Sequence, residues 1–264
     1  MTRSRILPAL ALTLVGAFAT AGCDIVTADL RAEQTAQWQK TYPIDANGRV
    51  EIGNVNGKID VEPSGGNTVE VVAIKKAHGA TTDAAKEALD RITISEDVSS
   101  SHVKIETKLP RGGGLFGGSN GQVEYRVRVP ASIEARFSTV NGGVIVRGLS
   151  GRVEAETTNG GVTARDVSGQ LQASTTNGGL EIDLAKMPEG GVKLECTNGG
   201  IRVRLPRDAK ATISASITNG GIQTIDLPLD AGENSRRRLE ARMNGGGPRL
   251  EIEGTNGGIR LSPR

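Results

Sequence analysis

The sequence contains few of the residues from which globular cores and active sites are usually built. Phe, Tyr and Trp make up 2% of its 264 residues, and it has only two histidines and two cysteines. Aromatic side chains normally supply much of a core's buried area, so this fold must depend on many small side chains and on backbone hydrogen bonds. His78 and His102 flank no nucleophile in the sequence, and we expect both to be solvated surface residues.

Disulfides and a strong net charge are also missing. One of the two cysteines, Cys23, is assigned below to a lipid, which leaves Cys196 as a lone thiol that we expect to pack as a small apolar residue. The chain has 32 Lys and Arg against 30 Asp and Glu, and removal of Arg3 and Arg5 with a signal peptide would balance them at 30 each. A neutral body argues against nucleic-acid binding, which requires a net basic face.

Long hydrophobic runs are absent after the first 20 residues. At the N-terminus, Arg3 and Arg5 precede an apolar run, residues 6–20, that is too short to span a bilayer comfortably. Small residues follow it. This order is typical of an export signal, and we predict a signal peptide over residues 1–22.

The stretch Thr20-Ala21-Gly22-Cys23 resembles the lipobox of bacterial lipoproteins, except that Thr20 stands where Leu is usual. The resemblance implies that Cys23 carries a diacylglycerol and becomes the first residue of the mature chain. Two or three acyl chains hold a protein stably on a membrane. The chain is therefore expected to be exported and anchored in the bacterial cell envelope, on the periplasmic side or the outer surface. An ordinary cleaved signal is the alternative.

An Asn-Gly-Gly triplet dominates the rest of the sequence. Its copies begin at Asn141, Asn159, Asn177, Asn198, Asn219, Asn244 and Asn256, spaced by 18, 18, 21, 21, 25 and 12 residues, and Asn56-Gly57-Lys58 is an earlier copy. Asn-Gly is a strong turn signal because both residues tolerate positive φ. We predict that these eight asparagines mark structural turns.

Apolar and polar residues alternate on both sides of each triplet, as in Val153-Glu154-Ala155 and Leu180-Glu181-Ile182. Period-two alternation predicts short strands with one buried face. A second turn, such as Leu149-Ser150-Gly151, lies between triplets, so each unit holds two strands and two turns. One unit cannot bury its apolar face alone, whereas stacked units can. The sequence predicts an all-β fold, a β-solenoid or roll with coils about 4.8 Å apart and stacked asparagines. A meander of separate hairpins is the alternative.

The N-terminal half is less regular. Residues 23–42 are predicted as a polar tether and residues 43–264 as the β-solenoid domain, with regular repeats over 131–264. Residues 78–130 are expected to contain a short capped helix near 82–92 and a long hairpin with its tip at 111–121.

The combination of lipobox, opening coil, short helix and repeated T-N-G-G-[VIL] coils resembles the putative-adhesin family of bacterial β-strand-repeat proteins. The resemblance covers about residues 43–264. It implies a β-strand-repeat fold and a domain of uncharacterised function, with adhesion, sensing or scaffolding as possible roles.

Motifs that carry chemistry are absent: there is no H-E-x-x-H, paired C-x-x-C or Gly-Lys-Ser/Thr loop. The triplets lack the Asp of calcium-binding β-rolls. Arg236-Arg237-Arg238 is interpreted as a solvated loop, with contact to lipid phosphates as the alternative. We therefore expect no catalytic residue, no cofactor and no metal.

The sequence favours a non-enzymatic, lipid-anchored envelope protein. Its partners would be the membrane, through the lipid, and an unknown envelope or surface protein or glycan, but no nucleic acid. Three alternatives remain: an envelope-stress sensor or scaffold, a polysaccharide-processing β-helix enzyme, and a binder of ice or crystal surfaces. The last would use the column of threonines that precede the triplets, Thr158, Thr176, Thr197 and Thr218. The enzyme would need carboxylates clustered on one face, and the candidates Glu154, Glu156, Glu181, Asp183 and Glu195 are interspersed with Arg and Lys.

Overall fold

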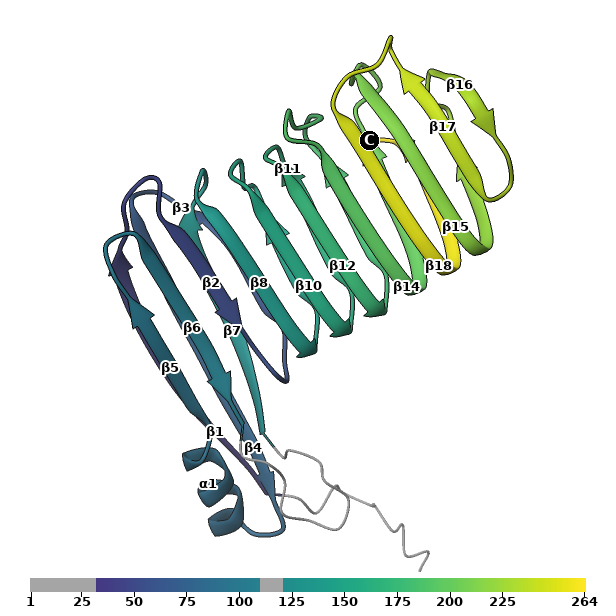
Figure 1. The fold of residues 1–264 in the computed structure, drawn as a ribbon. Coiled ribbons are helices and arrows are strands. Elements are labelled where there is room, and N and C mark those ends of the chain that lie inside the picture. The colour runs from purple at the N-terminus through teal and green to yellow at the C-terminus, as the bar shows by residue number, and fades with distance from the viewer. Residues whose placement is uncertain (1–31, 110–120) are drawn as a thin grey trace, which may run out of the picture. The chain divides into compact units, whose positions relative to one another are not determined.

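The computed structural model describes residues 32–109 and 121–264, which form 18 β-strands and one α-helix. The predicted signal peptide and Cys23 lie outside the described residues. The predicted all-β solenoid is confirmed: successive coils stack on one another, and each contributes one strand to each of two facing sheets (Figure 1). No helix among these residues is long and apolar enough to cross a membrane.

The regular coils alternate between the two sheets. The first sheet contains β2 (Arg49–Gly53), β8 (Glu134–Asn141), β10 (Val153–Asn159) and β12 (Leu171–Asn177), and the second contains β3 (Ile59–Ser64), β9 (Val144–Arg147), β11 (Val162–Val167) and β13 (Leu180–Leu184). Three longer strands run through their triplet and belong to both sheets: β14 (Val192–Leu205), β15 (Ala211–Thr224) and β18 (Arg249–Pro263). These strands pair with one another in parallel, which excludes the meander of hairpins.

The core follows from the alternation. In β10, Val153 and Ala155 are fully buried, while Glu154 between them points to solvent. Across the stack, aliphatic side chains from the two sheets meet in one continuous core. The large buried side chains Tyr125 and Phe137 lie in its N-terminal part. Small side chains suffice elsewhere because each coil buries its face against its neighbours.

The coils do not stack in sequence order. The coil of β2 and β3 lies between β6 (His102–Lys108) and β7 (Gly121–Pro130) on one side and β8 and β9 on the other. Similarly, the C-terminal strand β18 lies between β14 and β15 (Figure 1). A coil near each end of the chain is therefore inserted into the stack rather than added to it.

Antiparallel strands close both ends. At the N-terminal end, β1 (Ala32–Pro43) pairs with β4 (Thr68–Gly79), which pairs with β7, while β5 (Thr93–Val98) pairs with β6. At the C-terminal end, β15 pairs with β17 (Arg238–Met243), which pairs with β16 (Leu229–Asn234). The helix α1 (Thr82–Asp90) is capped by the Thr81 hydroxyl, which accepts a hydrogen bond from the Ala84 amide. It ends at Asp90, two residues before the predicted boundary, and Ile92 beyond it is buried in the core.

Two predicted boundaries are wrong. The tether was expected to reach residue 42, but residues 32–42 form most of β1, in which Ala36 and Trp38 pack against the core. The hairpin expected within 78–130 does not exist, because β6 and β7 lie in opposite sheets as the two strands of one coil. The intervening residues 110–120, which include most of the predicted hairpin tip, lie outside the described residues.

Candidate interaction surfaces

A ladder of asparagine side chains runs along one edge of the stack. Six hydrogen bonds of 2.8–3.0 Å join, in stack order, Asn56, Asn141, Asn159, Asn177, Asn198, Asn256 and Asn219, and in each bond the Nδ2 of one asparagine donates to the Oδ1 of the asparagine before it. The Nδ2 of Asn56, at the start of the ladder, donates to the carbonyl of Gly121. The structure thus brings together seven of the eight asparagines identified from the sequence. Because most of these side chains are exposed and fixed by their neighbours, the ladder is a pre-ordered polar edge.

Asn244 is the exception, and its assignment as a coil turn is wrong. It lies between β17 and β18 with φ of 51°, and its Nδ2 donates to the carbonyls of Arg207 and Ala209. The physical reason is that residues 229–243 form an antiparallel cap. The Asn-Gly-Gly after this cap makes a local turn rather than a coil edge.

The glycine after each ladder asparagine permits close stacking. Of the two residues that tolerate positive φ, the glycine adopts it in these coils: Gly160 and Gly178 have φ of 153° and 155°. A Cβ on Gly178 would lie 1.8 Å from the carbonyl oxygen of Gly160. The hydroxyls of Thr157 and Thr175 donate to the carbonyls of Gly142 and Gly160 in the preceding coil, each at 2.8 Å.

A groove of about 610 Å³ opens where the ladder meets β4 and β7. It is lined by Asn56, Gly57, Lys58, His78, Gly121, Gln122, Glu124, Asn141, Gly142 and Gly143. Sequence reasoning identified the two asparagines but missed Gln122 and Glu124. Their approach depends on the pairing of β7 with β3 and β4, and no local signal in the sequence encodes that pairing.

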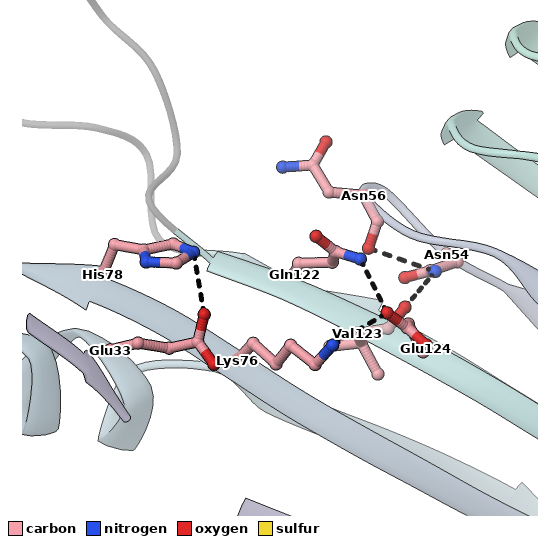
Figure 2. Close-up of polar contacts among 8 residues, drawn as sticks. All are labelled: Glu33, Asn54, Asn56, Lys76, His78, Gln122, Val123 and Glu124. Carbon is pink, nitrogen blue, oxygen red and sulfur yellow. Dashed lines mark hydrogen bonds and ion pairs between the residues drawn. The ribbon is translucent and has the colours of Figure 1, made fainter. Parts of the chain in front are cut away.

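Polar groups in and beside the groove are largely bonded to one another (Figure 2). Glu124 Oε1 accepts from Lys76 Nζ at 3.0 Å and from Gln122 Nε2 at 3.1 Å. The imidazole Nε2 of His78 lies 3.6 Å from Glu33 Oε2 (Figure 2). Glu124 is the one carboxylate among the described lining residues and is paired with Lys76, so these residues are suited to polar contacts rather than to proton transfer.

The other residues considered for catalysis are separate from one another. His102 Nε2 lies 3.7 Å from Glu51 Oε1 on the outer face of the first sheet. Cys196 is buried and its Sγ lies 3.4 Å from the Gly178 carbonyl oxygen, and burial raises the pKa of this thiol. Burial also raises the pKa of the Tyr125 hydroxyl, to about 12. The described residues contain no group of three or more His, Cys, Asp or Glu side chains placed to hold a metal ion.

The carboxylates considered for a glycan-processing site are paired with cations. Arg136 lies 3.4 Å from both Glu154 and Glu156, and Arg204 lies 3.5 Å from both Glu181 and Asp183. Glu195 pairs with Lys193 at 2.6 Å. The two outer faces therefore present rows of paired charges on exposed strands.

A polar cluster that the sequence did not reveal closes the N-terminal end. Glu96 of β5 accepts hydrogen bonds from Lys40 Nζ at 2.8 Å and from Tyr42 Oη at 2.6 Å. Burial raises the pKa of Glu96, but the two hydrogen bonds and the Lys40 charge outweigh it, so the net pKa is lowered. Burial and the Glu96 carboxylate both raise the pKa of Tyr42.

The basic run lies along the edge of β15, next to both its first-sheet and its second-sheet halves. The carbonyls of Arg236 and Arg237 accept hydrogen bonds from the Ile222 and Ile217 amides of β15. Arg238 begins β17 and pairs with Glu233 at 3.2 Å. The loop is thus held by its backbone.

These features define an all-β repeat protein in which parallel coils share one core and one ladder of asparagines. Within that class, the chain belongs to the Toastrack DUF4097 family, whose sequence profile matches residues 40–262. No curated protein matches the chain.

Several solved structures are similar to this chain over most of its length. A "putative cell adhesion protein" from Clostridium sporogenes is 14% identical, with 88% of this chain and 100% of that chain covered and a TM-score of 0.47. A "putative adhesin" from Bacteroides fragilis is 10% identical, with 86% and 97% covered and a TM-score of 0.38. A "putative lipid binding protein" from Parabacteroides distasonis is 12% identical, with 86% and 97% covered and a TM-score of 0.29.

Proposed function

We propose that the protein is a non-enzymatic, lipid-anchored component of the bacterial cell envelope that acts as an adhesin-like interaction scaffold. One observation carries the proposal. The parallel coils hold exposed polar side chains in fixed rows on two strand faces and along the asparagine ladder. Such a surface is ordered before any partner binds, which reduces the entropy lost on association.

The anchor is assigned to Cys23, within the lipobox-like stretch that ends the predicted signal peptide. A lipid at this position would place the solenoid beside a membrane while its strand faces stay available. Contact with an envelope or surface protein or glycan would then use these faces.

Binding is favoured over polysaccharide processing. A glycosidase requires two carboxylates that are free to donate a proton and to attack. Glu154, Glu156, Glu181 and Asp183 instead lie within 4 Å of arginine side chains.

The anchor is tested by changing Cys23 to Ala in the full-length chain. We expect unprocessed precursor, or release from the membrane fraction, together with loss of labelled palmitate. Wild-type protein in the same cells provides the reference. Retention of both the label and the membrane association would contradict the lipid anchor.

The interaction role is tested with the purified full-length protein in detergent and isolated bacterial envelopes. We expect saturable binding that is lost when the protein is unfolded by heat beforehand. Turnover of an envelope glycan that a single carboxylate substitution abolishes would instead establish an enzyme.

A further inference from the structure

We propose that the C-terminal part of the second sheet binds an anionic glycan through Arg202 and Arg260. These residues occupy equivalent positions on the neighbouring parallel strands β14 and β18. Like charges placed directly opposite each other on adjacent strands are destabilising. A ligand that carries negative charge would remove this repulsion. The inference rests on the proposed interaction role and specifies its partner.

Neither arginine has a carboxylate within ion-pair distance among the residues that the structure describes. The nearest acidic position in the same row is Glu181, which is the strand neighbour of Arg202 but contacts Arg204 at 3.5 Å. Asp183 is likewise held by Arg204 and by Arg264, whose Nε lies 3.0 Å away. Since the local acids are already paired with other arginines, the guanidinium groups of Arg202 and Arg260 face solvent without a counter-charge.

Neighbouring groups extend the site. Gln223 of β15 follows Arg260 in the same row and supplies neutral hydrogen-bonding groups. A Cβ on Gly221 would lie 3.7 Å from Arg236 Nε, which places the Arg236 side chain over the end of this face. The adjacent row consists of Gly200, Gly258 and Gly221, so this row places no side chain beside Arg202 and Arg260.

The chemistry of the row selects oxyanions. A guanidinium offers two parallel N–H donors that match a carboxylate or a phosphate group. The coil spacing sets the two arginines about 4.8 Å apart, close enough for one oxyanion to contact both or for neighbouring groups of a polymer to contact one each. Carboxylate- and phosphate-bearing glycans share this chemistry.

Two other classes of polyanion fit less well. Insertion into a membrane surface uses exposed apolar side chains, and the exposed large hydrophobic residues of the described chain, Val98 and Val140, lie on the other sheet. Binding of single-stranded nucleic acid uses aromatic side chains that stack on bases, and the row contains none. A polar anionic polymer lying on the strands fits best.

The experiment measures binding of the full-length protein in detergent to immobilised oligogalacturonate, to a phosphate-bearing glycan and to neutral dextran. We expect binding to one or both acidic polymers, weakened by NaCl because exposed charges are screened, and none to dextran. The double variant Arg202→Gln/Arg260→Gln should bind at least about tenfold more weakly, since each charge-assisted hydrogen bond contributes about that factor.

The matched control is Arg49→Gln/Arg136→Gln. It removes the same charge from the first sheet, where both arginines already have glutamate partners. We expect its affinity to equal that of the wild type. A second readout is the melting temperature without ligand, which should be unchanged or higher in Arg202→Gln/Arg260→Gln because the repulsion is relieved.

Four results with the purified protein, and a fifth with isolated envelopes, would overturn the inference. The first four are absence of binding to both acidic polymers, equal loss in the two double variants, binding only to vesicles with anionic lipid, and salt-sensitive self-association that Arg202→Gln/Arg260→Gln abolishes. If isolated envelopes still retain the wild type and the variant equally, the glycan inference fails while the interaction role stands. Failure of the wild-type protein to bind isolated envelopes would contradict the proposed function.

Discussion

At the scale of single residues, the stack depends on what each triplet position does for the neighbouring coil. The side-chain amide of each donor asparagine donates a hydrogen bond to the side-chain oxygen of the asparagine in the neighbouring coil, as Asn177 does to Asn159. The Thr two positions earlier donates to a glycine carbonyl, as Thr175 does to Gly160. The first glycine contributes by having no side chain. Its carbonyl and the glycine of the next coil are so close that any Cβ would overlap the backbone.

Gly178→Ala tests this close approach. The added Cβ would lie 1.8 Å from a backbone oxygen, at a φ of 155° that side chains rarely adopt. We expect a loss of at least about 3 kcal/mol in the free energy of unfolding, measured by urea titration with circular dichroism. Gly65→Ala is the control because a Cβ there meets nothing within 4 Å, and its effect should be small. Similar losses in both variants would refute the argument.

The cluster of Glu96, Lys40 and Tyr42 makes the stability of the fold depend on pH. Because the folded-state pKa of Glu96 is below its ordinary value of 4.5, its ionised form stabilises the fold above that pH. This stabilisation is lost as pH falls through the folded-state pKa. Glu96→Gln should therefore lower stability at pH 7, and the difference from wild type should shrink at acidic pH.

Urea unfolding at several pH values measures the Glu96 effect. Tyr42→Phe keeps the ring but removes one hydrogen bond to Glu96, and it should reproduce part of the change. A difference between wild type and Glu96→Gln that stays constant with pH would exclude the proposed linkage.

At the scale of elements, the repeating structural unit of the solenoid is one coil of two strands and two turns. Period-two alternation and the triplets were sufficient to predict the regular strands from β8 to β14. They could not predict that β6 and β7 belong to opposite sheets, because alternation indicates a buried face but not a partner. The same limit explains β1, whose alternating Ala36 and Trp38 are separated by polar residues that suggested a tether.

Two deletions test the coil as a unit. Removal of residues 160–177 joins Asn159 to Gly178, restores Thr-Asn-Gly-Gly and lets β10 lie against β14. Stability should fall modestly, because a solenoid loses only one repeat and its neighbour contacts.

Removal of residues 160–168 instead joins Asn159 to Gly169, so that a first-sheet strand follows another first-sheet strand. Mispaired edges should unfold or aggregate this variant. Melting curves by far-ultraviolet circular dichroism compare the two. Equal damage, or more damage from the longer deletion, would mean that the triplets do not mark coils.

At the scale of the whole molecule, the inserted position of β18 makes the C-terminus part of the interior of the stack. Deletion of residues 249–264 would remove the strand between β14 and β15, not a terminal coil. We expect β15, β16 and β17 to lose their attachment and residues 206–248 to become sensitive to protease, while residues 121–205 stay protected. Mass spectrometry of limited digests measures this. Continued protection of residues 206–248 would show that β15 can pair directly with β14.

The sequence by itself determined the repeating unit: which residues face inward, where each coil turns, and that its asparagines can stack. These properties are local, because they follow from alternation and from the conformations open to Asn and Gly. The order of the coils was decided only by the tertiary structure. Inward residues of β14, β18 and β15 are similar aliphatic side chains, such as Val192, Leu250 and Ile213. Backbone ladders do not distinguish among such coils, so local sequence patterns alone do not determine their order.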